Sequence, residues 1–322
     1  MRSALIGGLL LLLATGSAAA TEILRLQLLW VPQAQFAGFY LAEDRGWYAE
    51  AGLDVRILAH GPEHDPVAAL ERNRADVALL YLTQALKARD QGIPVVNIGQ
   101  LIHHSSLALV SRRELGILGP EDLHGRRVAR WPGFALQPEA LFQAYGIEPD
   151  IIDQGPDMTL FTRGVVDVAM ATAYNELVEL YLSGMDAEDL SLLWLQDHGV
   201  GLVEDGIYVL QTILEERHDA LHRFVETSLR GWRAAFDDPQ AAVDAVMARA
   251  QTAGIRTNRA HQLRMIDALR PLYLREDGTL RGPLLCAADY DRAHGMMTRF
   301  GELENDPVPL AAFHLFPDHA AP

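Results

Sequence analysis

Residues 28–55 read LLWVPQAQFAGFYLAEDRGWYAEAGLDV and carry the clearest structural pattern of the chain. A short apolar strand over residues 24–30 ends in Trp30, and a turn that contains proline follows at 31–35. The aromatic spacing from Phe36 onward predicts a helix that Gly52 closes, and alternation over residues 53–57 predicts a second strand. Ligands of open α/β sheets lie outside the carboxyl ends of such strands. Trp30 and residues 33–40 are therefore expected at a ligand site.

The same order of elements occurs twice, over residues 39–92 and over residues 141–184. In both, a helix ends at glycine, a strand follows, and Gly-Pro makes a turn before a short helix. That helix leads to a strand with the sequence Asp-Val-Ala, at 76–78 and at 167–169, and then to a further helix. This repetition predicts two similar α/β lobes.

The segments between and after the repeats predict how the lobes are connected. Apolar runs at 94–100 and 107–110 predict buried strands, residues 206–210 predict a returning strand, and helical patterns fill residues 214–300. We expect a hinged two-lobe binding protein whose cleft closes on a small ligand. Lobe 1 is expected to comprise residues 21–110 plus 209–322 with the C-terminal helices, and lobe 2 residues 111–208.

Composition limits the class of protein. The 322 residues suffice for two domains, and the formal charge of −16 argues against nucleic acid or an anionic membrane as partner. Residues 1–20 have the pattern of a secretory signal peptide: Arg2, an apolar core at 5–14 and alanines at 18–20. Cys286 is the only cysteine, so neither an intramolecular disulfide nor a lipid-bearing N-terminal cysteine is expected. We expect a soluble periplasmic protein.

Aromatic and acidic side chains at the predicted strand ends are the candidate ligand contacts. Flat rings there can stack on a planar ligand, although core packing is the alternative for each of them. Glu176 follows Asn175 at a predicted helix start, where it would either cap the helix or face the cleft as an acceptor. The candidate ligand-binding residues are Trp30, Gln35, Phe36, Tyr40, Tyr81, Trp131, Tyr174, Asn175, Glu176 and Glu204.

Signals for catalysis or metal binding are weak. His60 and His64 are separated by Gly-Pro, and His103-His104 point in opposite directions if extended. The chain has no phosphate-binding loop, nucleophile elbow or His-Glu-x-x-His motif, and Cys286 is expected to be buried on a late apolar helix. We therefore expect no catalytic residue, no metal site and no cofactor.

With these residues in view, the chain resembles the periplasmic pyrimidine-precursor-binding proteins of thiamine-related ABC importers, which are related in fold to fungal thiamine-pyrimidine synthases. The matching stretches are residues 26–55, 92–100 (GIPVVNIGQ), 173–176 (AYNE) and 204–208 (EDGIY). The resemblance implies a type II periplasmic-binding-protein fold with a formylated aminopyrimidine in its cleft. By the same resemblance Trp30 and Tyr174 contact the ring, Glu176 is a polar partner, and a permease with its ATPase receives the ligand from a monomer.

The resemblance is incomplete, and other functions stay open. His103-His104 and the loop at 131–134 (WPGF) depart from the family pattern, and relatives bind other vitamin precursors, including flavins. An enzyme akin to the fungal synthases would, by resemblance, use pyridoxal phosphate and a cysteine-rich motif, whereas this chain has one cysteine and one lysine, Lys87. A sensor input is a third possibility. An alkanesulfonate, taurine or nitrate binder would need an anion cradle at helix starts.

Overall fold

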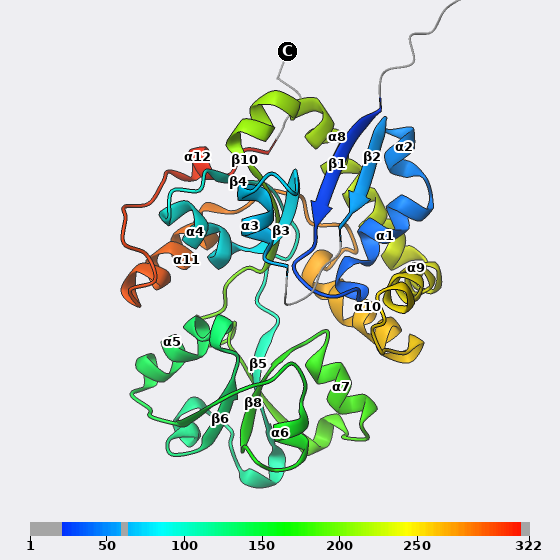
Figure 1. The fold of residues 1–322 in the computed structure, drawn as a ribbon. Coiled ribbons are helices and arrows are strands. Elements are labelled where there is room, and N and C mark those ends of the chain that lie inside the picture. The colour runs from blue at the N-terminus through cyan, green and yellow to red at the C-terminus, as the bar shows by residue number, and fades with distance from the viewer. Residues whose placement is uncertain (1–20, 59–63, 317–322) are drawn as a thin grey trace, which may run out of the picture.

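The computed structural model describes residues 21–58 and 64–316. The predicted signal peptide at 1–20, His60 and the Gly-Pro turn at 61–62 lie outside the described residues. The chain folds into two lobes, each built on a five-stranded mixed sheet, as the sequence predicted (Figure 1). No helix within the described residues is long and apolar enough to span a membrane.

The two sheets have the same topology. In spatial order the upper sheet contains β2 (Leu53–Ile57), β1 (Glu22–Gln27), β3 (Val77–Tyr81), β10 (Asp205–Leu210) and β4 (Val95–Gln100). The lower sheet contains β7 (Asp150–Asp153), β6 (Arg127–Arg130), β8 (Val168–Thr172), β5 (Leu107–Arg112) and β9 (Leu190–Trp194). The first three strands of each sheet are parallel, and the fourth is antiparallel to both neighbours. That fourth strand, β10 or β5, arrives directly from the other lobe.

The repeated Asp-Val-Ala motif has the same physical role in both lobes. Asp76 accepts hydrogen bonds from the backbone N (2.8 Å) and the guanidinium of Arg25 on the adjacent strand. Asp167 binds the backbone N (3.0 Å) and the guanidinium of Arg127 in the same way. Burial alone would raise the pKa of the Asp76 carboxyl, but its bonds to Arg25 hold that pKa below the ordinary value. Each aspartate thus fixes the register of the central strand pair.

Helices cover both sheets, with most of them on the upper lobe (Figure 1). The upper lobe carries α1 (Ala37–Asp44), α2 (Trp47–Glu50), α3 (Pro66–Glu71), α4 (Leu82–Asp90), α8 (Gln211–Asp237), α9 (Pro239–Thr252), α10 (Arg259–Tyr273), α11 (Ala287–Arg299) and α12 (Leu310–Phe313). The lower lobe carries α5 (Leu136–Tyr145), α6 (Thr159–Thr162) and α7 (Glu176–Leu182). α10 also contacts α7 and α11 contacts α5, so the C-terminal helices touch both lobes.

Two local expectations differ from the structure. The single helix expected from Phe36 to Gly52 is broken into α1 and α2, because Gly46 adopts a left-handed conformation (φ +70°) between them. The lobe boundaries expected at residues 110 and 209 are also displaced. β5 pairs within the lower sheet and β10 begins at Asp205 in the upper one, so the chain crosses at 101–106 and at 195–204. The apolar run of a central strand does not reveal which sheet it joins.

Candidate functional site

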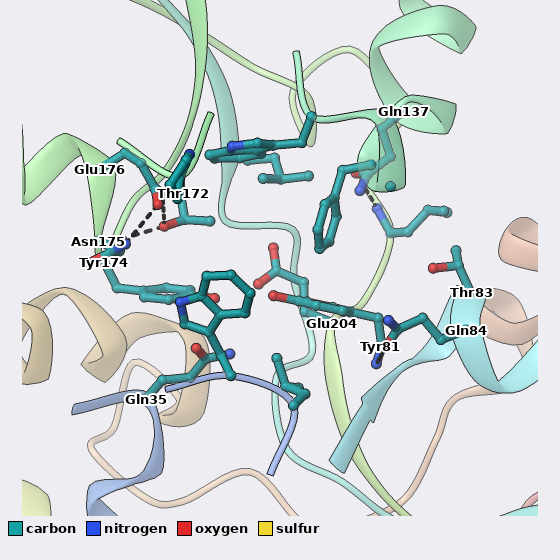
Figure 2. A pocket seen from close by; sticks show the side chains of 18 of the residues that line it. Gln35, Tyr81, Thr83, Gln84, Gln137, Thr172, Tyr174, Asn175, Glu176 and Glu204 are labelled. Atoms are coloured by element: carbon teal, nitrogen blue, oxygen red, sulfur yellow. Dashed lines mark hydrogen bonds between the residues drawn. The ribbon is translucent and has the colours of Figure 1, made fainter. Parts of the chain in front are cut away.

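A cavity of about 500 Å³ lies between the lobes. It lies outside the carboxyl ends of the parallel strands of both sheets, where ligands of α/β proteins bind. The loops after β1, β3, β6, β7 and β8 all contribute, together with Leu107 at the start of β5 and residues 202–204 of the return crossing. Figure 2 shows side chains from both lobes pointing into this space, with the Glu204 carboxyl between them.

Eight of the ten predicted ligand residues line this cavity: Trp30, Gln35, Tyr81, Trp131, Tyr174, Asn175, Glu176 and Glu204. The other two, Phe36 and Tyr40, do not line it, which corrects the prediction. Both are fully buried in the hydrophobic core of the upper lobe, where α1 packs against α8. The face of α1 that carries Tyr40 turns toward the helices behind the sheet, and Arg249 of α9 lies 5.1 Å from the Tyr40 ring. For these two residues the alternative of core packing is correct.

Glu176 is held in a defined position at the start of α7. Its Oε2 accepts hydrogen bonds from the backbone N (2.9 Å) and Oγ1 (2.6 Å) of Thr172, and its Oε1 accepts one from Asn175 Nδ2 (2.7 Å). These bonds appear as dashed lines in Figure 2. The Asn175 side chain makes no capping bond to the helix. The β8–α7 loop therefore orients a buried carboxylate toward the cavity, and Oε1, which accepts only one of these bonds, retains acceptor capacity.

Glu204 and Asp205 form a buried acidic pair where the return crossing enters β10. Glu204 accepts hydrogen bonds from the backbone N and from Oγ (3.0 Å) of Ser106, which ties the two crossings together. Asp205 Oδ2 accepts a bond from Gln35 Nε2 (2.8 Å), and Gln33 donates to Gln35 Oε1 (2.7 Å). The hinge and the loop after β1 thus share one polar network.

Burial governs the protonation of this pair. It raises the pKa of the Glu204 carboxyl to about 8, and the neighbouring Asp205 and Glu176 add to the rise while the bonds from Ser106 oppose it. Burial likewise raises the pKa of Asp205 to about 7, against the bond from Gln35. The pKa values of the Tyr81 and Tyr174 hydroxyls are raised well above the ordinary value, mainly by burial. At neutral pH Glu204 therefore holds a proton, whereas an ordinary glutamate would not.

Aromatic rings supply most of the flat surface. Phe134 meets Tyr81 edge to face, with ring centroids 4.8 Å apart, and Trp131 lies 6.0 Å from Phe134. Trp131 Nε1 donates to the Gly155 carbonyl (2.9 Å), which fixes the indole on the lower lobe. Tyr174 belongs to the lower lobe but packs into the core cluster of the upper lobe. The rings thus come from both sides of the cleft.

Sequence reasoning did not select several polar residues of the cavity. Gln137 accepts bonds from Ser105 Oγ and from the backbone N of Leu202, both at 3.0 Å. Gln154 pairs with the backbone of Met170 through bonds of 2.8 and 2.9 Å. Gln154 directly precedes the Gly-Pro turn at 155–156, which could have identified it. Gln137 carries no such signal, because it lies on an ordinary first turn of α5.

Other candidate groups lie elsewhere. Cys286 is exposed and precedes α11, so the expectation of a buried helical cysteine is wrong. The apolar residues at 284–285 continue the helical pattern in the sequence, but the helix begins only at Ala287. His103 and His104 lie on the first crossing, and burial lowers the pKa of both imidazoles. Within the described ranges, no group of three or more histidine, cysteine, aspartate or glutamate residues is placed to hold a metal ion.

The sequence is similar to a known protein family and to several characterised proteins. The family model described as NMT1/THI5 like matches residues 33–242. The riboflavin-binding protein RibY of Chloroflexus aurantiacus is 27% identical over 226 residues, 67% of this chain and 63% of that protein. The formylaminopyrimidine-binding protein of Halalkalibacterium halodurans is 24% identical over 236 residues, 71% of each. A 4-amino-5-hydroxymethyl-2-methylpyrimidine phosphate synthase of Saccharomyces cerevisiae, THI13, is 24% identical over 184 residues, 54% of each.

Solved structures support the fold. The periplasmic aliphatic sulphonate binding protein SsuA of Escherichia coli superimposes with a TM-score of 0.70 at 14% identity, over 94% of each chain. At that identity the similarity concerns the two-lobed fold and not the ligand. The alignment with RibY spans 63% of that protein's length, less than two thirds.

Proposed function

This chain belongs to the NMT1/THI5-like family, and we propose that it is the extracytoplasmic solute-binding protein of an ABC importer that captures a small planar heterocycle. One observation carries this proposal: aromatic rings and buried carboxyl groups from both lobes converge on a single cavity of about 500 Å³. A ligand that contacts both lobes favours their closure. A membrane permease with its ATPase would receive the ligand from the monomer in the periplasm.

For the ligand we propose a thiamine pyrimidine precursor such as a formyl-aminopyrimidine, salvaged for thiamine biosynthesis. Such a ring can stack on Trp30 and Tyr174, which line the cavity from opposite lobes. Its ring nitrogen and adjacent exocyclic amine form an edge that complements the oriented carboxylate of Glu176. The formylaminopyrimidine-binding relative supports this assignment.

The charge of the cavity favours a neutral or cationic ligand. Among the described residues that line it there is no lysine, arginine or histidine. Two acidic residues line it, Glu176 and Glu204, and Glu204 holds a proton at neutral pH. Sulfonates and phosphates are bound by cationic side chains or by clusters of backbone N–H groups at helix starts. We therefore do not assign the alkanesulfonate ligand of the structural neighbour to this chain.

A binding role also fits better than that of a pyrimidine synthase. The described lining of the cavity contains neither a lysine for a Schiff base nor a cysteine. Lys87 and Cys286 lie outside it. Riboflavin is the second candidate ligand. It is favoured by the similarity to RibY and by a planar ring that suits the same aromatic surfaces.

A thermal-shift panel on the purified mature protein tests the proposal. It contains formyl-aminopyrimidine, hydroxymethylpyrimidine, thiamine, riboflavin, taurine and pyridoxal phosphate. A ligand that binds only the folded state raises the melting temperature with its concentration. We expect a rise with the pyrimidines and none with taurine. If only riboflavin raises the melting temperature, the transport role stands and riboflavin is the ligand. If none of the heterocycles raises it, the proposed function is refuted.

A further inference from the structure

A second cavity of about 460 Å³ adjoins the first. The two share much of their lining: Thr83, Gln84, Gly133, Phe134, Gln137 and Leu202. Phe134 borders both cavities, whereas Trp30 and Glu176 line only the first. Helix α4 forms its upper wall and the residues around the start of α5 its lower wall. The space between the lobes therefore extends beyond the region assigned to a ring.

The chemistry changes from one cavity to the next. Trp30, Trp131 and Tyr174 line the first, whereas the only aromatic residue among those lining the second is the shared Phe134. The α4 side of the second cavity presents hydroxyl, amide and ammonium groups: Thr83, Gln84, Lys87 and Gln91. Such a wall offers both donors and acceptors but no flat surface for stacking.

The charges of this wall favour an uncharged partner. Lys87 is the only cationic residue among those that line the second cavity, and its ammonium already donates to the Glu302 backbone carbonyl. Two acidic residues, Asp65 and Glu302, belong to the same lining. A phosphate would meet this acidic excess, whereas hydroxyl groups can both donate to and accept from such a wall.

Two glutamines connect the cavities. Gln84 Oε1 accepts a bond from the backbone N of Tyr81 (3.0 Å), and Gln137 Oε1 accepts bonds from Ser105 and Leu202. Gln137 Oε1 thus accepts two bonds from the protein and Gln84 Oε1 accepts one, and the side-chain N–H groups of both glutamines are donors that can serve a ligand. Figure 2 shows Gln84 and Gln137 on opposite sides of the same end of the pocket, with Thr83 beside Gln84. The side-chain N–H groups of Gln84 and Gln137 can therefore donate hydrogen bonds to a ligand substituent that extends past Phe134.

We propose that the second cavity is a subsite for an uncharged polyhydroxylated substituent of the ligand, carried by the ring that the first cavity holds. This rests on the proposed function, since the ring must occupy the first cavity. A single-ring pyrimidine fills the first subsite alone. A heterocycle with a hydroxylated arm occupies both and binds more tightly than the same ring without the arm.

Matched flavins test the arm separately from the ring. Lumiflavin has a methyl group where riboflavin has its polyhydroxyl chain, and flavin mononucleotide adds a phosphate to that chain. Dissociation constants from flavin fluorescence quenching are expected to be at least tenfold lower for riboflavin than for lumiflavin. Flavin mononucleotide is expected to bind more weakly than riboflavin. Equal binding of riboflavin and lumiflavin, or tighter binding of the phosphorylated compound, would overturn the proposal.

Variants of Lys87 test whether the contribution of the polyhydroxyl substituent to binding comes from the second cavity, because Lys87 lines only that cavity. Lys87→Met is expected to weaken riboflavin binding about threefold or more without changing lumiflavin binding, and Lys87→Gln is expected to restore part of the loss. Arg292→Met, on an exposed face of α11, is the matched control. An equal effect of Lys87→Met on both flavins, or none on riboflavin, contradicts the subsite.

Formyl-aminopyrimidine separates the two proposals. If it binds while riboflavin binds no better than lumiflavin, or while neither flavin binds, the second subsite is refuted and the proposed function stands. If neither the pyrimidine nor any flavin binds, the proposed function fails and the subsite fails with it.

Discussion

Tyr81 and Phe134 meet edge to face with their ring centroids 4.8 Å apart and their planes at 90°, although they belong to different lobes. Tyr81 ends β3 of the upper sheet, and Phe134 lies in a short 3-10 helix (Pro132–Phe134) after β6 of the lower sheet. Phe134 lines both cavities and Tyr81 only the first. This contact joins the lobes and separates the two parts of the cleft.

The Tyr81–Phe134 contact is expected to contribute a measurable coupling energy. Edge-to-face pairs contribute about 0.5–1.5 kcal/mol beyond burial. A double-mutant cycle with Tyr81→Leu and Phe134→Leu, measured by urea unfolding, should return a coupling of that size. The same cycle with Tyr81→Leu and Tyr145→Leu, whose ring contacts His198 instead, should be additive. Additivity in both cycles would show that the interlobe contact is not formed in solution.

Removal of the Trp30 indole should weaken ligand binding. Stacking of a flat ring on an aromatic side chain contributes about 1–3 kcal/mol, so Trp30→Ala should raise the dissociation constant of formyl-aminopyrimidine by a factor of roughly 5–150. Isothermal titration calorimetry measures this dissociation constant. Trp47→Ala is the control, because Trp47 packs under the Arg230 guanidinium (3.9 Å) and is absent from the lining of both cavities. Equal affinity of Trp30→Ala and parent would remove Trp30 from the site.

Neutralising Glu176 should weaken binding without unfolding the protein. Glu176→Gln keeps the shape but replaces one acceptor oxygen with an N–H donor, and a hydrogen bond to a charged group contributes about 1.5–3 kcal/mol. We expect at least a tenfold loss of affinity for formyl-aminopyrimidine, measured by calorimetry. Glu188→Gln, an exposed carboxylate outside both cavities, should change nothing. A thermal melt checks the fold, and unchanged affinity of Glu176→Gln contradicts its assignment.

Stability should fall as the pH rises from 7 to 9. Burial raises the pKa of Glu204 to about 8 and of Asp205 to about 7, whereas both carboxyls have pKa values of about 4 in the unfolded chain. The folded state holds protons that the unfolded state has released. Their stabilisation is therefore complete below the unfolded pKa and is lost as the pH rises through the folded values.

Urea unfolding across this range should show a loss on the order of 2 kcal/mol. Four partly buried histidines do not interfere, because desolvation lowers their pKa values below the ordinary value: His103, His104, His261 and His314. The double variant Glu204→Gln, Asp205→Asn should have a flatter profile. A profile as steep as that of the parent would mean that other groups titrate.

The two Arg–Asp pairs of the repeat should differ in strength. Asp76 is nearly inaccessible (side chain 6% exposed) and also meets Arg217, whereas the Asp167 side chain is 19% exposed and its partner Arg127 46%. Asp76→Ala should cost about 3 kcal/mol of unfolding free energy, because it removes the buried carboxylate that Arg25 and Arg217 share. Asp167→Ala should cost about 1 kcal/mol. Equal losses in urea unfolding would show that burial does not govern these pairs.

Much of the fold was predictable because its signals are local. The Asp-Val-Ala repeats mark β3 and β8, and each Asp binds an arginine on the strand beside it. Aromatic and acidic residues after predicted strands identified most of the cavity, because parallel strands direct their following loops to one edge of a sheet. Glycines such as Gly52, at φ +74°, ended the elements where expected.

The sequence-based predictions were wrong where contacts between residues far apart in the chain decide the structure. Phe36 and Tyr40 lie within ten residues of Trp30 in the sequence. In the structure they pack into a hydrophobic core to which α8 and α9, about 200 residues later in the chain, also contribute. Periodicity shows that a helix has an apolar face, but not whether that face meets a ligand or another helix. Likewise, nothing local assigns β5 to the lower sheet.

By itself the sequence determined the family, the two α/β lobes and the loops that line the cavity, because these depend on strand periodicity, turn residues and motif order. Only the tertiary structure decided which side chains share the cleft. Glu204 meets Ser106 across 98 positions and Asp205 meets Gln35 across 170. The burial that raises the pKa of both carboxyls exists only once the crossings are packed together. The polar second cavity likewise forms only where α4 faces the other lobe.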